Sequence, residues 1–83
     1  MSRLIKTPEE IREIVRVRID RLAEIRNSAA SIDVPLPTAR PPDATGCNWD
    51  MFAFGGAATY ERLIHGEVAA VRARVNLAEP VAT

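Results

Sequence analysis

The sequence predicts an all-α fold, namely a two-helix antiparallel hairpin with a long Pro-rich connection. Apolar residues recur at helical spacing over residues 8–28 and 57–77, and four prolines lie between these stretches, within residues 31–48. Each helix of such a pair covers only one side of its neighbour. We therefore expect a second copy of the chain to complete a four-helix bundle.

The first helix has a recognisable N-terminus. Thr7 can cap the free backbone amides, Pro8 suits the first helical position, and Glu10 can bond back to Thr7 in a capping box. Apolar residues then recur on one face of the helix. We expect a short lead-in over residues 1–7 and a helix over about residues 8–28.

The second helix has two candidate starts. Asn48 is a suitable cap for a helix that begins at Trp49. Gly55 and Gly56 each disfavour a helix by about 1 kcal/mol relative to alanine, so the other candidate start is near Ala57.

From either start, the helical period continues to residue 77, and residues 78–83 follow as a tail. The chain is therefore expected to form one helical-hairpin domain over residues 8–77. Prolines keep its connection, residues 31–48, extended, and we expect it to lie across the two helices because Val34 and Leu36 give it apolar side chains to bury.

Composition limits the classes of partner. The chain has 83 residues, enough for one domain, and its 11 basic and 11 acidic residues give a net charge of zero. We expect no nucleic-acid partner, because such proteins carry a basic excess or a basic patch. Cys47 is the single cysteine, and no apolar run approaches the ~20 residues of a membrane span. We therefore expect a cytoplasmic protein that does not enter a membrane.

Two charged residues fall on apolar helix faces. Arg18 lies within the apolar face of the first helix, and Glu67 lies within that of the second. A lone buried charge costs several kcal/mol, so we expect a buried ion pair between them, within the hairpin or across a dimer interface. The alternative is that Arg18 extends along its aliphatic stem to water while Glu67 lies at an edge.

An interface is expected on the second half of the chain. An aromatic segment precedes the second helix, and such residues either anchor an interface or fill a small core. The helix itself carries two apolar stripes, which is more than one partner helix covers. The expected interface residues are Trp49, Phe52, Phe54, Leu63, Ala70 and Leu77.

These patterns favour a small non-enzymatic protein–protein interaction module that forms a homodimer. One alternative is an accessory or assembly protein of a larger complex, such as a phage particle, that completes its core on a partner. Another is a small metal-binding protein or enzyme that uses His65 and Glu61, which stand four residues apart on one helix face. Two ligands fall short of the four typical of a structural zinc site, so neither a metal nor a cofactor is expected.

Overall fold

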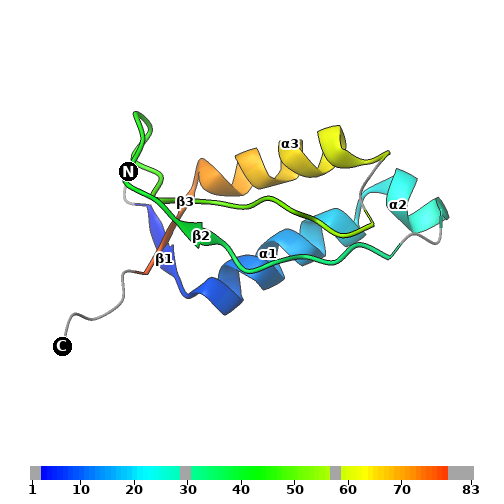
Figure 1. The fold of residues 1–83 in the computed structure, drawn as a ribbon, viewed down its shortest axis with the longest axis horizontal. Helices are drawn as coiled ribbons and strands as arrows, with labels where there is room; N and C mark the ends of the chain where they lie inside the picture. The colour runs from blue at the N-terminus through cyan, green and yellow to red at the C-terminus, as the bar shows by residue number, and fades with distance from the viewer. Residues whose placement is uncertain (1–2, 29–30, 57–58, 79–83) are drawn as a thin grey trace.

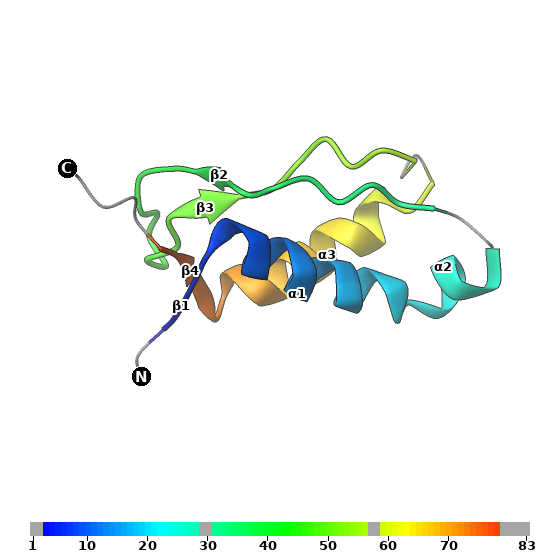
Figure 2. The same ribbon diagram turned by 90° about the horizontal axis from the view of Figure 1, so that it is seen from below.

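The computed structural model is a mixed α/β fold and describes residues 3–28, 31–56 and 59–78 (Figure 1). The elements in chain order are β1 (Leu4–Lys6), α1 (Pro8–Asp20), α2 (Ala23–Ser28), β2 (Thr38–Ala39), β3 (Trp49–Asp50), α3 (Glu61–Arg72) and β4 (Val75–Leu77). The helices α1 and α3 run antiparallel side by side, and an extended hairpin, residues 31–56, covers one side of the pair (Figure 1; Figure 2). The prediction of an all-α fold is therefore wrong, because it assigned strand residues to helix, loop and lead-in.

The predicted capping box of α1 is present. Thr7 Oγ1 accepts a hydrogen bond from the Glu10 amide at 3.2 Å, and Glu10 Oε1 accepts one from the Thr7 amide at 3.0 Å. The helix ends at Asp20 rather than near residue 28, and α2 is a separate short helix. Ile25 of α2 is nevertheless buried in the core, together with the apolar face of α1.

The 31–56 hairpin contains residues that the sequence assigned to a loop and to the start of a helix. Its register is set by the pairs Asp33–Gly55, Thr38–Asp50 and Ala39–Trp49. Trp49 and Met51 are buried whereas Phe52 is exposed, which follows the two-residue period of a strand. A helix start at Trp49 is therefore wrong, and the other candidate start, Ala57, lies outside the described residues.

The end of the chain also differs from the prediction. β4 lies parallel to β1, with Leu4 opposite Val75, Ile5 opposite Asn76 and Lys6 opposite Leu77. Val75 and Leu77 are buried and Asn76 between them is not, so this segment has the period of a strand. The helix predicted to continue to residue 77 is thus too long, and part of the predicted lead-in is a strand. Residues 1–2 of that lead-in and, apart from Ala78, the predicted tail lie outside the described residues.

The core lies between the helix pair and the hairpin. Its most completely buried side chains are Trp49, Ile11, Ile19, Met51, Ile64, Val15 and Cys47. Burying a large apolar side chain contributes about 1.5–3 kcal/mol. Within the described ranges no polar or charged side chain is buried, and no helix has the length and apolar character needed to cross a membrane.

Candidate functional site

The outer edge of β4, the edge that faces away from β1, is closed by side chains from β3 and the residue before it. The Leu77 amide donates to Asn48 Oδ1 at 2.8 Å, and Asn48 Nδ2 donates to the Leu77 carbonyl at 3.0 Å. Trp49 Nε1 donates to the Val75 carbonyl at 2.8 Å. These two side chains occupy positions at which a neighbouring strand would supply its backbone groups, so they block this edge of β4.

Among the described residues, no strand or side chain covers the outer edge of β1. The Leu4 amide donates to the Arg74 carbonyl at 3.0 Å, and the Ala78 amide donates to the Lys6 carbonyl at 2.8 Å. Because backbone groups alternate in direction along a strand, the amide and carbonyl of Ile5 face away from β4. Within the described residues nothing bonds to them. The side chains of Leu4 and Ile5 are 58% and 62% exposed.

A polar network fixes the tip of the hairpin against the end of α3. Arg72 donates from Nε to the Trp49 carbonyl at 3.0 Å and from a terminal nitrogen to Asp43 Oδ2 at 2.9 Å. Hydrogen bonds from the hydroxyl and amide of Thr45 hold the pKa of Asp43 below its usual range, and Arg72 adds to this effect. On the other side, Asn76 Nδ2 donates to the carbonyl of Gly46 at 3.0 Å. The network therefore holds Trp49 where it closes β4.

Arg3 satisfies the C-terminal end of α3. Its guanidinium donates to the Ala73 carbonyl at 3.1 Å and contacts the Arg72 carbonyl, and its Nε donates to Asn76 Oδ1 at 2.6 Å. A cation at this end of a helix also interacts favourably with the helix dipole. The segment just before β1 is thus tied to α3, which orients the strand.

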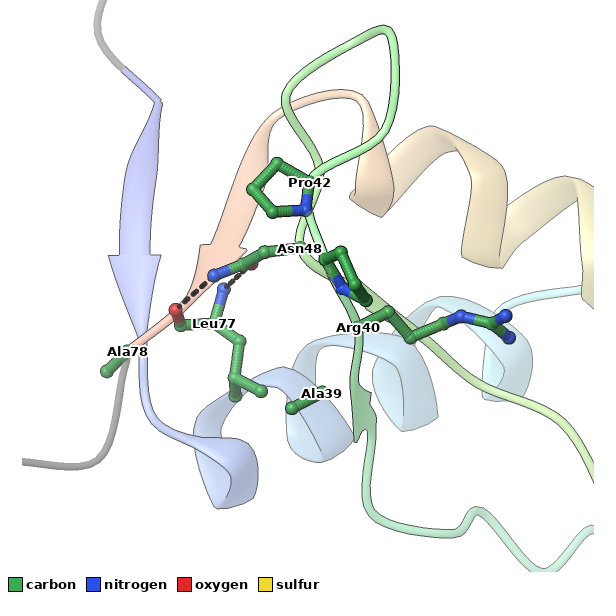
Figure 3. A pocket seen from close by; sticks show the side chains of 7 residues that line it. Ala39, Arg40, Pro42, Asn48, Leu77 and Ala78 are labelled. Carbon is green, nitrogen blue, oxygen red and sulfur yellow. Dashed lines mark hydrogen bonds between the residues drawn. The ribbon is translucent and has the colours of Figure 1, made fainter.

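A pocket of about 410 Å³ lies beside the end of β4 (Figure 3). It is lined by Ala39, Arg40, Pro41, Pro42, Asn48, Leu77 and Ala78. The guanidinium of Arg40 points away from Leu77, and both polar atoms of the Asn48 amide are already bonded to the backbone of Leu77 (Figure 3). The pocket can therefore receive a small apolar group, but it presents no group for acid–base or nucleophilic chemistry.

The structure separates the residues expected to form an interface. Trp49 and Leu77 are buried in the core of one chain. Phe54 is half-buried against the core and Ala70 is half-buried on α3. Phe52 and Leu63 remain exposed, at 47% and 37%. Of the stripe Leu63, Ala70 and Leu77, which the sequence left for a second chain, Leu77 alone is buried.

Arg18 and Glu67 do meet, within one chain. Arg18 Nε donates to Glu67 Oε1 at 3.0 Å and joins α1 to α3. The pair is not buried as expected, because the two side chains are 44% and 26% exposed. It lies at the margin of the α1–α3 contact, where both charges keep access to water. Such a pair contributes little to stability, about 0–1 kcal/mol.

The candidate metal ligands His65 and Glu61 are not joined by the cysteine. His65 and Glu61 line a cavity of about 130 Å³ together with Phe52 and Phe54. Cys47 is buried, and its thiol lies 3.3 Å from the Trp49 carbonyl. Across the described ranges, no three His, Cys, Asp or Glu side chains are grouped so as to hold a metal ion.

Sequence reasoning missed two surfaces. The first is the open edge of β1, which lay in the predicted lead-in; a strand of three residues is too short to show a period. The second is a groove of about 480 Å³ along α1, lined by Lys6, Glu10, Glu13, Ile14, Val17, Arg18 and Arg21. Its apolar residues, Ile14 and Val17, lie next to the predicted core face of the helix. They were therefore not identified from the sequence as a separate surface.

Comparison of this chain with models of protein families, with curated proteins and with solved structures finds no match. A functional assignment therefore rests on the geometry of these surfaces.

Proposed function

We propose that this chain is a small non-enzymatic protein–protein interaction module that binds an extended segment of a partner along the outer edge of β1. The observation that carries the proposal is the open edge itself. Ile5 directs its amide and carbonyl away from β4, and its side chain and that of Leu4 are mostly exposed.

The chemistry of this edge selects the partner. A backbone amide and carbonyl on a strand edge are satisfied by the backbone of another extended chain, as in β-strand addition. The exposed apolar side chains beside them favour a partner strand with apolar residues. A two-stranded sheet is weak by itself, so a third strand strengthens it as well as binding to it.

The contrast with β4 supports placing the contact on β1. Natural proteins cover or block strand edges that are not used for pairing. Here Asn48 and Trp49 block the edge of β4, while the edge of β1 carries no such device among the described residues. The same open edge supports the accessory role, in which the chain completes its sheet on a larger assembly.

The cytoplasmic location that we propose is supported by Cys47. It is the one cysteine of the chain, and its thiol is buried in the core. A chain without disulfides is typical of a reducing compartment.

A displayed library of random seven-residue peptides provides the test. Binders selected on the wild-type protein are measured again on Ile5→Pro, which removes the outward amide together with the exposed Ile5 side chain, and on Phe52→Ser, which removes an exposed apolar side chain elsewhere. We expect the selected peptides to shift the amide NMR signals of β1, to lose binding to Ile5→Pro and to keep it with Phe52→Ser. Peptides that bind Ile5→Pro as tightly as wild type would contradict the proposal.

A further inference from the structure

α1 carries a second stripe of residues beside its buried line. Ile11, Val15 and Ile19 face the core. Ile14 and Val17 lie on the neighbouring face, half-buried, and form the apolar middle of the groove along α1. Throughout the described residues, no other element lines this groove apart from Lys6 of β1. The face is therefore open to another molecule.

The order of residues along this stripe is symmetrical. Glu10, Ile14, Val17 and Arg21 follow one another at spacings of four, three and four residues. Such alternating spacing is the pattern with which one helix packs along another. In the reverse direction along the helix the spacings are again four, three and four residues, but the basic residue comes first and the acidic residue last.

This symmetry makes the stripe complementary to a reversed copy of itself. When two α1 helices pack antiparallel, Glu10 of each chain faces Arg21 of the other, and Ile14 of each faces Val17 of the other. A parallel arrangement would instead place Glu10 beside Glu10 and Arg21 beside Arg21. Charge complementarity thus selects the antiparallel arrangement and a second copy of this chain as the occupant.

The end charges are available for such contacts. Arg21 is exposed, and its side chain has no partner among the described residues. Glu10 uses Oε1 for the capping box, which leaves Oε2 for a second donor. Hydrogen bonds from Thr7 lower the pKa of Glu10, so this side chain carries its charge at neutral pH.

Two of the charges that flank the stripe, Glu13 and Arg18, already have partners within their own chain. Glu13 accepts hydrogen bonds from Arg16, and Arg18 donates one to Glu67. They therefore bring no unbalanced charge to a contact between two copies.

We propose that two copies of this chain associate through the groove along α1, antiparallel, about a two-fold axis that passes between Ile14 and Val17. The two α1 helices meet at the interface, and each α3 packs against the α1 of its own chain, so the dimer contains four long helices. This interface replaces the one predicted on α3. The two β1 strands lie at opposite ends of the pair, so this inference does not depend on the proposed strand addition.

Two charge-reversal variants test the geometry. In Glu10→Lys alone, the introduced lysine of each copy would face Arg21 of the other; in Arg21→Glu alone, the introduced glutamate would face Glu10. Each variant by itself is expected to associate at least roughly tenfold more weakly than wild type, because two attractive pairs become repulsive. An equimolar mixture restores both attractive pairs. In a parallel dimer the wild-type pairs would already be repulsive, so the single variants would be no weaker than wild type.

The solution mass is measured by size exclusion with light scattering at micromolar concentration, with far-UV circular dichroism showing that each variant is folded. Glu10→Lys also removes half of the capping box, and the mixture corrects for this because it contains the same folded variant. The matched control is Arg12→Glu, the same charge change on the far side of α1.

We expect a wild-type dimer, two weakened single variants, a restored dimer in the mixture and a dimeric Arg12→Glu control. A monomeric wild type, single variants as tight as wild type, or a mixture no tighter than its components would overturn the inference. Each of these results would leave the proposed binding at β1 standing, since that is measured with peptides and with Ile5→Pro.

Discussion

The two outer edges of the small β1–β4 sheet differ in one respect. On β4, side-chain groups of Asn48 and Trp49 bond to the backbone of Leu77 and Val75. On β1, the backbone groups of Ile5 face outward with no described partner. The same sheet is therefore blocked on one side by its own chain and, as far as the described residues extend, uncovered on the other.

This difference separates structural from functional residues. The side chains that close β4 also belong to the core or to the polar network around it, so changes there are expected to lower the free energy of unfolding. The outward amide and carbonyl of Ile5 make no hydrogen bond to the described residues of the chain. Changes there are expected to alter binding while stability stays the same.

The largest effect is expected at Trp49, which is fully buried and bonded to β4. Trp49→Ala should lower the free energy of unfolding by about 3–5 kcal/mol, because it leaves a large cavity. Trp49→Phe keeps most of the packing and loses the bond to Val75, and should cost about 1–3 kcal/mol. Urea denaturation measures both values, and a Phe variant as stable as wild type would show that the bond to β4 is unimportant.

A smaller effect is expected at Asn48. Asn48→Ala leaves the amide and carbonyl of Leu77 without their partners and should cost about 1–3 kcal/mol. The control is Asn27→Ala, which changes an exposed asparagine on α2 and should stay within about 0.5 kcal/mol of wild type. Thermal and urea denaturation of the two variants distinguish them, and equal stabilities would argue against a closed edge on β4.

Proline substitution distinguishes the two sides of β1 directly. Leu4→Pro removes the amide that bonds to Arg74, so we expect a loss of about 1–3 kcal/mol. Ile5→Pro removes an amide that faces outward, so its free energy of unfolding should remain within about 0.5 kcal/mol of wild type. If Ile5→Pro proved less stable than Leu4→Pro in urea, the amide of Ile5 rather than that of Leu4 would be the one that bonds to β4.

The smallest effect concerns the hairpin tip, through Asp43. Its pKa is lowered in the folded protein by the hydrogen bonds from Thr45, so the ionised form is favoured in the fold. The resulting stabilisation is present above the unfolded pKa, at about 4, and is lost as the pH falls through the lower folded pKa. Asp43→Asn should therefore lose less stability than wild type between about pH 5 and about pH 2, as measured by urea denaturation at each pH. If the free energy of unfolding depended on pH equally in wild type and in Asp43→Asn, ionised Asp43 would not stabilise the hairpin tip.

Several features could be predicted from local sequence because their causes are local. The capping box of α1 depends on residues within one turn, and it is present. The Arg18–Glu67 contact follows from helical spacing on two helices that do pack together, although its exposure depends on the surrounding elements.

The strands could not be predicted because tertiary contacts define them. The spacing of Val71 and Val75 fits a helix as well as it fits the turn into β4. The side chain of Asn48 could cap a helix. In the structure its side-chain amide instead bonds to the backbone of Leu77, as a neighbouring strand would. Only the position of Trp49 against β4, which is a long-range contact, distinguishes these two uses.

The α1 groove was missed for a different reason. Glu10 and Arg21 have the composition of an ordinary solvated face, and their complementarity to a reversed copy depends on the order of charges along the helix rather than on any single residue.

The most direct test of the difference between the two edges is amide hydrogen exchange of the free protein, measured by NMR and compared between Leu77 and Ile5. We predict that the amide of Leu77 is protected by its bond to Asn48 and exchanges slowly, while the amide of Ile5 exchanges nearly as fast as in an unfolded chain. A slow amide at Ile5, or a fast one at Leu77, would contradict the account.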